Sequence, residues 1–274
     1  MARRERTNGQ VKRVGIVGYG NLGKYLADCI QRDGERYNVE LAFVWNRNFA
    51  KLANFEPKSS ILHNLNDFAA FEPNLIVEVS HPDISKEYGT KFLQYCDYVI
   101  GSPSALADEH LEAKLRRAAN KFGLFVPKGA LWGAEDIRAL ARRGQLKGLN
   151  VEMRFHPRSL KLVEPLKTKN ESVKDEPLLL YKGSVRNICK LAPNNVNTMA
   201  CAAIAGESLG FDGTIGTLIS DPNLTFYHKI TIEVLGPIAE SGCQFKVTTE
   251  RRSPSFPGHL TSTATYNSFL NSLL

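Results

Sequence analysis

The pattern of apolar and polar residues changes period several times along the N-terminal half of the chain. An apolar strand with Val14, Ile16 and Val17 leads into a glycine-rich turn, after which Leu22, Leu26 and Ile30 recur at helical spacing. Strand-like and helix-like patterns then follow each other through residues 39–47, 74–80, 83–96, 97–102, 106–123 and 124–127. Alternation of this kind predicts a mostly parallel sheet that is covered by helices on both faces.

The second half of the chain has a different pattern, with strand-like runs that are not separated by long helices. These runs cover residues 146–157, 177–184, 214–220, 227–236 and 243–251. Only residues 129–144 and 195–210 have helical patterns, and the polar segment 167–177 is expected to be a loop. Strands with few helices between them predict an antiparallel sheet.

Composition narrows the class of protein. The chain has 274 residues, of which 43% are hydrophobic, and this is enough to bury a substantial core. It contains no apolar run near the roughly 20 residues that span a bilayer and no apolar leader, so we expect a cytoplasmic protein with no membrane partner. Five cysteines without CxxC spacing indicate a reducing compartment and no metal site.

The formal net charge of +7 does not by itself indicate a nucleic-acid partner. Residues 1–13 contribute five basic side chains against one acidic side chain, and the remaining positive charge is spread thinly along the chain. The sequence has no zinc-finger spacing, aromatic RNA-binding motif or long basic helix. We therefore expect a small anionic ligand and no nucleic acid.

The glycine-rich turn carries the first chemical signal. Gly18, Gly20 and Gly23 form a G-x-G-x-x-G motif between the first strand and the first helix. The first glycine permits a tight turn, the second lets the backbone approach a pyrophosphate, and the third lets helix and strand pack closely. Asn21 and Leu22 open the helix, whose N-terminus faces the phosphates. This segment predicts a dinucleotide site.

The end of the second strand indicates which dinucleotide is bound. NAD-binding domains usually have an acidic residue there, which holds the ribose hydroxyls. This chain has Asn46 and Arg47 instead, and an amide and a guanidinium accept a 2′-phosphate. NADP is therefore expected to bind at least as well as NAD. The alternative is that Arg47 simply points into solvent.

Further cofactor contacts are expected where parallel strands end, because ligands bind beyond the carboxyl ends of such strands. Ser80 and His81 follow one strand, and Ser102 and Pro103 follow the next. His81 also precedes a proline and could equally well be part of a turn that enters a helix.

These observations predict an α/β protein with an N-terminal Rossmann-type doubly wound sheet and a second α+β domain that contains a mainly antiparallel sheet. The expected limits are 1–127 for the dinucleotide-binding domain and 128–250 for a substrate-binding and dimerisation domain. Residues 251–274 resume a helical pattern, with Leu260, Ala264, Phe269 and Leu273, and this C-terminal helix is expected to pack back on the first domain.

His228 stands at the beginning of the strand-like run 227–236, after the turn-forming pair Asp221–Pro222. A histidine at a strand end can be a structural residue, because strand ends are wet. It can also be the acid/base of a reaction, because its ring titrates near neutral pH. The alternation along the run would place His228 on the same strand face as Ile230 and Ile232.

Several stretches resemble one family, the L-aspartate dehydrogenases. The matching pieces are VGIVGYGNLGKYL, GSPSALAD, GALWGAEDI, NNVNTMACAAIAGESLGFDG, SDPNLTFYHKITIEVLGP and the closing helix, which is rich in Ser and Thr. They cover nearly the whole chain in the same order as in the family. The glycine motif is common to many dehydrogenases, whereas GALWGAEDI and the order Asn-Val-Asn, Asp-Pro, His are far more particular.

The resemblance implies a homodimer that oxidises L-aspartate to iminosuccinate with NAD or NADP. It implies that Ala130 and Asn197 contact the cofactor and that His228 is the catalytic residue. One departure from the family pattern is Lys128, which stands before Gly-Ala where many microbial relatives have a small hydroxyl residue. Because of this difference, the resemblance leaves open the geometry of the substrate site and the activity itself.

The implied substrate, L-aspartate or oxaloacetate with ammonia, carries two carboxylates that need cationic or amide partners. Lys128, Arg154, Asn197 and Lys229 are candidates, although lysine and arginine are usually plain surface residues. Two other functions stay open. One is an NADP-linked dehydrogenase or reductase for another small carboxylate or amino acid, and the other is a catalytically weak NADP(H)-binding regulatory protein.

Overall fold

The computed structural model describes residues 11–259 and 263–273, and the chain divides into two compact units. One unit comprises the chain up to Gly101 together with Lys114–Phe125, and the other comprises Ser102–Ala113 and Val126–Leu273. Within the described residues the chain therefore passes between the units three times. Most of the basic opening and Leu260 of the closing helix lie outside the described residues. The domain limits expected from the sequence stay predictions.

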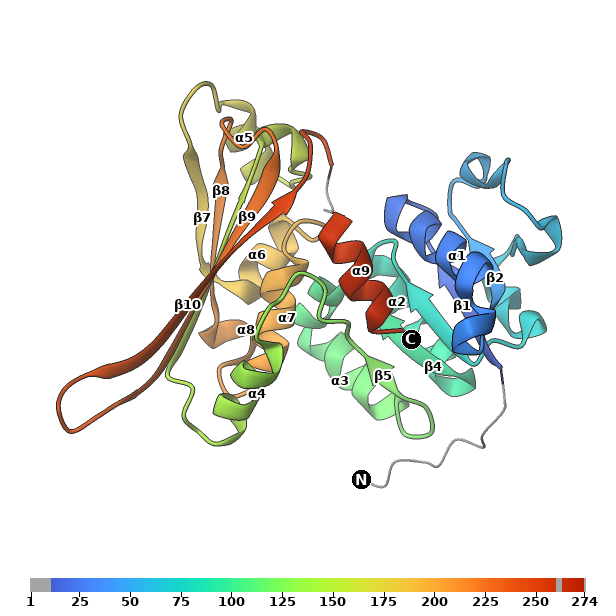
Figure 1. Ribbon diagram of the computed structural model, residues 1–274, viewed down its shortest axis with the longest axis horizontal. Helices are drawn as coiled ribbons and strands as arrows, with labels where there is room; N and C mark the ends of the chain where they lie inside the picture. Colours follow the sequence, from blue (N-terminus) through green and yellow to red (C-terminus); the bar gives the residue numbers. More distant parts are fainter. Residues whose placement is uncertain (1–10, 260–262, 274) are drawn as a thin grey trace. The chain divides into compact units, whose positions relative to one another are not determined.

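The first unit contains a five-stranded sheet in which all neighbouring strands are parallel (Figure 1). Its strands are β1 (Lys12–Val17), β2 (Val39–Trp45), β3 (Leu75–Glu78), β4 (Asp97–Ile100) and β5 (Leu124–Phe125), in the spatial order β2-β1-β3-β4-β5. Most residues of β1, β3 and β4 are buried. Such continuous apolar strands are typical of a parallel sheet covered on both faces.

The order in which the chain connects the strands determines which face of the sheet each helix covers. Helix α1 (Asn21–Asp33) connects β1 to β2, and α2 (Pro82–Tyr95) connects β3 to β4 in the opposite direction across the sheet. Because both crossovers are right-handed, the two helices cover opposite faces. The prediction of a doubly wound sheet is confirmed. The order reverses between β1 and β3, and the carboxyl ends of these two strands form the switch point where such sheets bind ligands.

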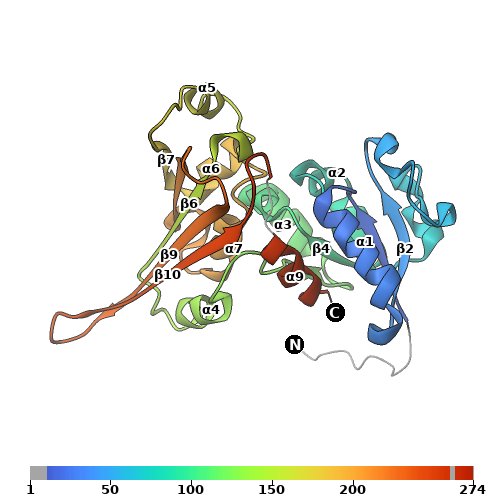
Figure 2. The same cartoon turned by 45° about the horizontal axis from the view of Figure 1, so that its top comes forward.

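The second unit contains a mixed sheet in the order β10-β9-β6-β8-β7. Its strands are β6 (Gly148–Phe155), β7 (Leu178–Ser184), β8 (Ile215–Ser220), β9 (Tyr227–Ile238) and β10 (Gln244–Pro254). Only the β6–β8 pair is parallel among the neighbouring strands that the structure describes, so the predicted mainly antiparallel sheet is confirmed. In Figures 1 and 2 the long hairpin of β9 and β10 extends beyond the other strands.

One face of this sheet is covered by helices, because the buried residues of its strands alternate with half-exposed ones. Helices α6 (Val185–Leu191) and α7 (Asn197–Ala205) contact that sheet, and α4 (Ala134–Arg142) and α8 (Gly210–Gly213) contact α7 (Figure 1). Helix α9 (Thr263–Asn271) groups with this unit and contacts β10. The expectation that it packs on the first domain stays a prediction.

Helices α5 (Leu166–Glu171) and α6 of the second unit were not expected from the sequence. Helix α5 lies in the segment predicted as a loop, and it buries only Leu166. Helix α6 begins directly after β7, because the Ser184 hydroxyl accepts a hydrogen bond from the Asn187 amide at 3.4 Å and so caps the helix. With no turn residues between strand and helix, the change of period is hidden in the sequence.

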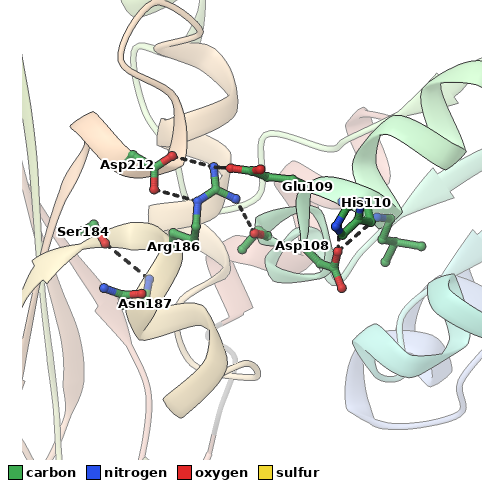
Figure 3. Close-up of polar contacts among 9 residues, drawn as sticks. Asp108, Glu109, His110, Ser184, Arg186, Asn187 and Asp212 are labelled. Carbon is green, nitrogen blue, oxygen red and sulfur yellow. Dashed lines mark hydrogen bonds and ion pairs between the residues drawn. The ribbon is translucent and has the colours of Figure 1, made fainter.

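Arg186 on α6 fixes the segment Ser102–Ala113 to the second unit (Figure 3). Its guanidinium binds both carboxylate oxygens of Asp212, at 2.6 and 2.7 Å, and donates to the Ala107 carbonyl at 2.5 Å. It also forms an ion pair with Glu109 at 3.1 Å. These bonds hold the short 3-10 helix η5 (Pro103–Ala107), whose five residues are all buried.

Two further observations concern the chain as described. The five cysteines are free thiols, and four of them are buried. No helix among residues 11–259 and 263–273 is long and apolar enough to cross a membrane.

Candidate functional site

The three glycines of the turn after β1 are required for different reasons. Gly18 has a φ of +117°, which L side chains rarely adopt, and a Cβ there would lie 2.8 Å from the Ser80 Cβ. A Cβ at Gly23 would lie 1.9 Å from the Gly18 carbonyl oxygen, so this glycine permits close packing of α1 on the turn. Both residues are therefore needed by the fold itself.

Gly20 differs from the other two. Its φ of −81° is ordinary, and a Cβ there would meet nothing within 4 Å. The fold does not explain why this position is a glycine, but a ligand that approaches the backbone does. Gly20 is also the N-cap of α1 and supplies no side-chain cap, so the first amides of the helix can bind phosphate oxygens. The residues present thus fit a dinucleotide pyrophosphate next to Asn21 and Leu22.

Asn46 and Arg47 occupy different environments at the end of β2. Asn46 is buried, and its side-chain oxygen accepts a hydrogen bond from the Tyr19 amide at 2.9 Å while its amide group donates to the Asn48 carbonyl at 2.7 Å. Asn46 therefore connects β2 to the glycine turn. Arg47 is exposed, and no ion pair joins it to the residues that the structure describes. Its expected role as a phosphate partner stays a prediction.

Ser80 and His81 lie beside the glycine turn, at the carboxyl end of β3. The contact between the Gly18 position and Ser80 brings these two strand ends together. His81 is the N-cap of α2, and its Nδ1 accepts a hydrogen bond from the Asp83 amide at 3.3 Å. The alternative of a helix-entry turn therefore describes His81 correctly, and a cofactor contact through its other ring nitrogen stays a prediction.

Glu78 is a residue of this region that we missed in the sequence. It is fully buried, and its carboxylate accepts a hydrogen bond from the Ser80 amide at 2.6 Å. Burial of Tyr98 is the main cause of its raised pKa, and the charge of Glu78 raises that pKa further. A glutamate inside an otherwise apolar strand was the available signal, because a buried carboxylate requires a partner.

The segment that contains Ala130 is a loop bounded by two glycines with positive φ, Gly129 at +55° and Gly133 at +76°. Ala130 is partly exposed. Lys128 is exposed and forms an ion pair with Glu135 at 2.5 Å, which lowers the pKa of that carboxyl. Ser102, which begins the segment that groups with the second unit, is buried.

His228 is buried in the second unit, with 5% of its surface exposed. Its ring lies edge-on to Phe155, with the ring centroids 4.6 Å apart. The Nε2 atom is buried and has no hydrogen-bond partner among the described residues. Burial lowers the pKa of the ring to about 4, although a hydrogen bond to the backbone of His259 acts in the opposite direction. The ring is therefore neutral at pH 7 and able to accept a proton.

A chain of hydrogen bonds connects the region of His228 to the segment that precedes α7. The Ser159 hydroxyl accepts from the Gly258 amide at 2.9 Å, next to His259. The Asn195 side chain donates to the Ser159 carbonyl at 2.9 Å, and its oxygen accepts from the Lys161 amide at 2.8 Å. These bonds fix the chain that leads into Asn197.

Asn197 is the first residue of α7, and its side-chain oxygen is buried without a hydrogen-bond partner among the described residues. An unsatisfied buried oxygen costs free energy, on the order of 1–3 kcal/mol. Asn197 and His228 thus share an uncommon property, which is consistent with ligand contacts at both positions.

Two of the candidate partners for a substrate carboxylate lie on the face of the sheet opposite to His228. Arg154 and Lys229 lie on the half-exposed face of the sheet, because side chains alternate between faces and both residues are next to a buried neighbour. Both are also ion-paired, Arg154 with Glu152 at 2.7 Å and Lys229 with Glu250 at 2.6 Å. His228 points to the helix-covered face, so these two residues do not share a face with it.

Two serines that the sequence did not single out do lie on the face of His228. Ser253 is the direct cross-strand partner of His228, and Ser255 follows it two residues later. Both are buried, and both hydroxyls lack a hydrogen-bond partner among the described residues. We refer to His228, Phe155, Ser253 and Ser255 as the histidine corner. The sequence shows these serines as polar residues near the end of the chain. Only the pairing register shows that Ser253 lies opposite His228.

Comparisons with known proteins agree with this architecture. The family described as aspartate dehydrogenase, C-terminal, matches residues 136–272, and the NAD binding domain of homoserine dehydrogenase matches residues 18–126. An aspartate dehydrogenase domain-containing protein of Xenopus tropicalis is 50% identical over 265 residues, which cover 96% of this chain and 93% of that protein. An L-aspartate dehydrogenase of Nitrosopumilus maritimus is 26% identical over 222 residues, which cover 78% and 79%.

The fold has a counterpart among solved structures. The crystal structure of aspartate dehydrogenase from Thermotoga maritima superposes with a TM-score of 0.67 at 21% identity and covers 96% of this chain and 95% of that chain. This likeness shows the two-part fold. The match of residues 18–126 to an NAD binding domain of the dehydrogenase type supports a nicotinamide cofactor.

Proposed function

Because the chain belongs to the L-aspartate dehydrogenase family, we propose that it oxidises L-aspartate at Cα to iminosuccinate with NAD or NADP as the hydride acceptor. Hydrolysis of the imine then gives oxaloacetate and ammonia. The single observation that carries the proposal is the buried Nε2 of His228, which has no partner among the described residues. A neutral ring with a free nitrogen is the group that this reaction needs as its base.

The chemistry requires one proton acceptor and one hydride acceptor. The substrate ammonium loses a proton to Nε2 of His228, which leaves the amine lone pair to form the C=N bond as hydride leaves Cα. The cofactor, when bound, supplies the hydride acceptor. The protonated ring then returns its proton to solvent or to the departing amine, and in its neutral form it can activate the water that attacks the imine. Phe155 orients the ring for these transfers.

The cofactor proposal rests on the turn and on the end of β2. Gly18, Gly20 and Gly23 shape the phosphate site, and the first amides of α1 bind its oxygens. We propose that NADP(H) binds at least as well as NAD(H), supported by the exposed guanidinium of Arg47 where NAD-binding domains usually have an acid. Asn197 and Ala130 are proposed as further contacts. A homodimer is proposed as the active form, and sedimentation of the purified protein tests it.

The decisive experiment follows the nicotinamide absorbance of NADH or NADPH with purified protein, oxaloacetate and ammonium. We expect oxidation of the cofactor only when both oxaloacetate and ammonium are present. Turnover without ammonium would indicate a reductase of oxo acids. Tight cofactor binding with no turnover of any amino or oxo acid would indicate the regulatory alternative. Either result would contradict the proposed activity.

A further inference from the structure

The helix-covered face of β10 carries a cation that the mechanism above does not use. Arg251 pairs with Ile230 across the β9–β10 ladder, and Ser253 pairs with His228. Directly opposed residues of antiparallel strands point to the same face, and so do residues two apart on one strand. Arg251, Ser253 and His228 therefore stand on one face, with Arg251 one pleat further along the strand.

Arg251 lacks the compensation that the neighbouring charges have. It is half-buried, and no carboxylate pairs with its guanidinium among residues 11–259 and 263–273. Burial lowers the pKa of this guanidinium, so the site disfavours an isolated positive charge. An anion next to the guanidinium would remove this cost.

Arg252, its neighbour in sequence, provides the contrast. It points to the other face, is mostly exposed, and donates to Glu250 at 2.8 Å. That carboxylate raises the pKa of Arg252. Two adjacent arginines on one strand thus have opposite electrostatic situations, and only the one on the face of His228 lacks an anion.

The spacing on this face fits a small dicarboxylate. Directly opposed residues have Cβ atoms about 5 Å apart, and diagonal neighbours about 7–8 Å apart. A substrate whose amine met Nε2 of His228 would have its α-carboxylate near the Ser253 hydroxyl, and an extended side chain at Arg251 would then be within reach of a second carboxylate two carbons away. Serine hydroxyls donate to carboxylates, and a guanidinium binds a carboxylate through two parallel hydrogen bonds.

We propose that Arg251 binds the side-chain carboxylate of the substrate, while Ser253, supported by Ser255, binds the α-carboxylate next to His228. This assignment rests on the proposed function for the identity of the substrate, and it makes Arg251 the residue that selects dicarboxylic over monocarboxylic acids. It replaces Arg154 and Lys229, which point away from His228.

The test compares Arg251→Met with the matched variant Arg252→Met in the full chain. Succinate and propionate serve as dicarboxylate and monocarboxylate probes in calorimetry, and L-aspartate turnover is measured alongside. We expect Arg251→Met to weaken succinate binding and to raise the KM for aspartate by roughly 10- to 100-fold, because a charge-assisted hydrogen bond is lost. The preference for succinate over propionate should disappear, and kcat should change by less than about threefold.

The controls separate a binding role from a structural one. Arg252→Met should stay within about twofold of wild type, and Arg251→Lys should recover part of the lost affinity because it keeps the charge. If the melting temperature shows that Arg251→Met does not fold, the preference for succinate over propionate is measured in Arg251→Lys and Arg251→Gln instead. An unchanged preference in a folded variant would overturn the proposal.

The outcomes also distinguish this proposal from the proposed function. If wild type binds succinate through Arg251 but does not oxidise aspartate, the aspartate assignment fails and the role of Arg251 stands. If aspartate is oxidised normally by Arg251→Met, the role of Arg251 fails alone. If wild type neither oxidises aspartate nor prefers succinate to propionate, both are overturned.

Discussion

The glycine turn of the first unit and the histidine corner of the second unit prepare for a ligand in opposite ways. At the turn, the proposed function depends on side chains that are absent: Gly20 has open space where a Cβ would be, and backbone amides remain available. At the histidine corner, the proposed function depends on side chains that are present, buried and without a hydrogen-bond partner among the described residues, namely His228, Ser253 and Ser255.

The difference has consequences for stability. The turn costs the fold little, because amides at a helix N-terminus can be hydrated when no ligand is bound. The buried polar atoms of the corner cost free energy in the absence of a partner. We therefore expect substitutions at Gly20 to affect binding alone, and substitutions at the corner to affect both catalysis and stability.

The largest effect is expected from a substitution in the histidine corner. His228→Asn removes the base, and we expect kcat to fall on the order of a hundred- to ten-thousandfold, with cofactor affinity unchanged. Steady-state kinetics at saturating NADPH, together with the melting temperature, measure this. A folded variant that binds cofactor and turns over within tenfold of wild type would make His228 a structural residue.

The second-largest effect is expected from a substitution in the glycine turn. Gly20→Val should weaken NADPH binding by about a hundredfold or more, because the side chain occupies the approach to the backbone amides and more than one phosphate hydrogen bond is lost. The melting temperature should stay near that of wild type, since a Cβ at Gly20 meets nothing within 4 Å. Gly23→Ala is the matched control and should unfold the protein, because its Cβ would lie 1.9 Å from a carbonyl oxygen. Native NADPH affinity in Gly20→Val would remove the phosphate site from this turn.

The third prediction uses pH to measure the cost of burying the corner. The pKa of His228 is lowered from 6.5 to about 4 in the folded chain, so the unfolded chain binds more protons between these values. The contribution of His228 to stability is complete above pH 6.5 and is lost as the pH falls towards 4, by up to about 3 kcal/mol. Urea unfolding of the cofactor-free protein at pH 7 and pH 4.5 measures it. His228→Gln should lose less stability than wild type over this range, and an equal loss in both would contradict the assignment.

The smallest effect is expected from a substitution at Arg47, which tests how the cofactor site distinguishes NADPH from NADH. Arg47→Ala should weaken NADPH binding by roughly 10- to 100-fold, through loss of charge-assisted hydrogen bonds to the 2′-phosphate, and should leave NADH binding unchanged. Fluorescence titration of both cofactors into both proteins measures the difference. Equal losses for NADH and NADPH, or no loss at all, would show that Arg47 does not distinguish the two.

The glycine turn could be predicted from the sequence because its geometry is local. The positive φ of Gly18 and the close approach at Gly23 depend on residues within one strand, one turn and one helix. The parallel sheet followed for a related reason, because strand and helix periods alternate within each short segment. The resemblance to a family then proposed Asn197 and Ala130 as cofactor contacts, which no local pattern in this chain distinguishes, and gave His228 the role of a base.

The serines and Arg251 could not be predicted because they depend on register. The β9–β10 ladder shifts between Gln244 and Lys246, and a slip of one residue would exchange the two faces of β10. Arg252 and Pro254 would then stand beside His228 in place of Arg251, Ser253 and Ser255. Alternation within a strand is visible in a sequence, but the face that meets a given residue of the partner strand is not.

The arrangement around Arg186 limits how this protein can be divided or recombined. Residues 102–113 lie within the first half of the chain but belong to the second unit, where Arg186 binds Asp212, Glu109 and the Ala107 carbonyl. A fragment that ends at Phe125 would carry the apolar segment Pro103–Ala107 without the residues that bury it. The nucleotide-binding half is therefore not a transferable module, and a chimera that exchanges it between relatives must exchange Arg186 and Asp212 along with it.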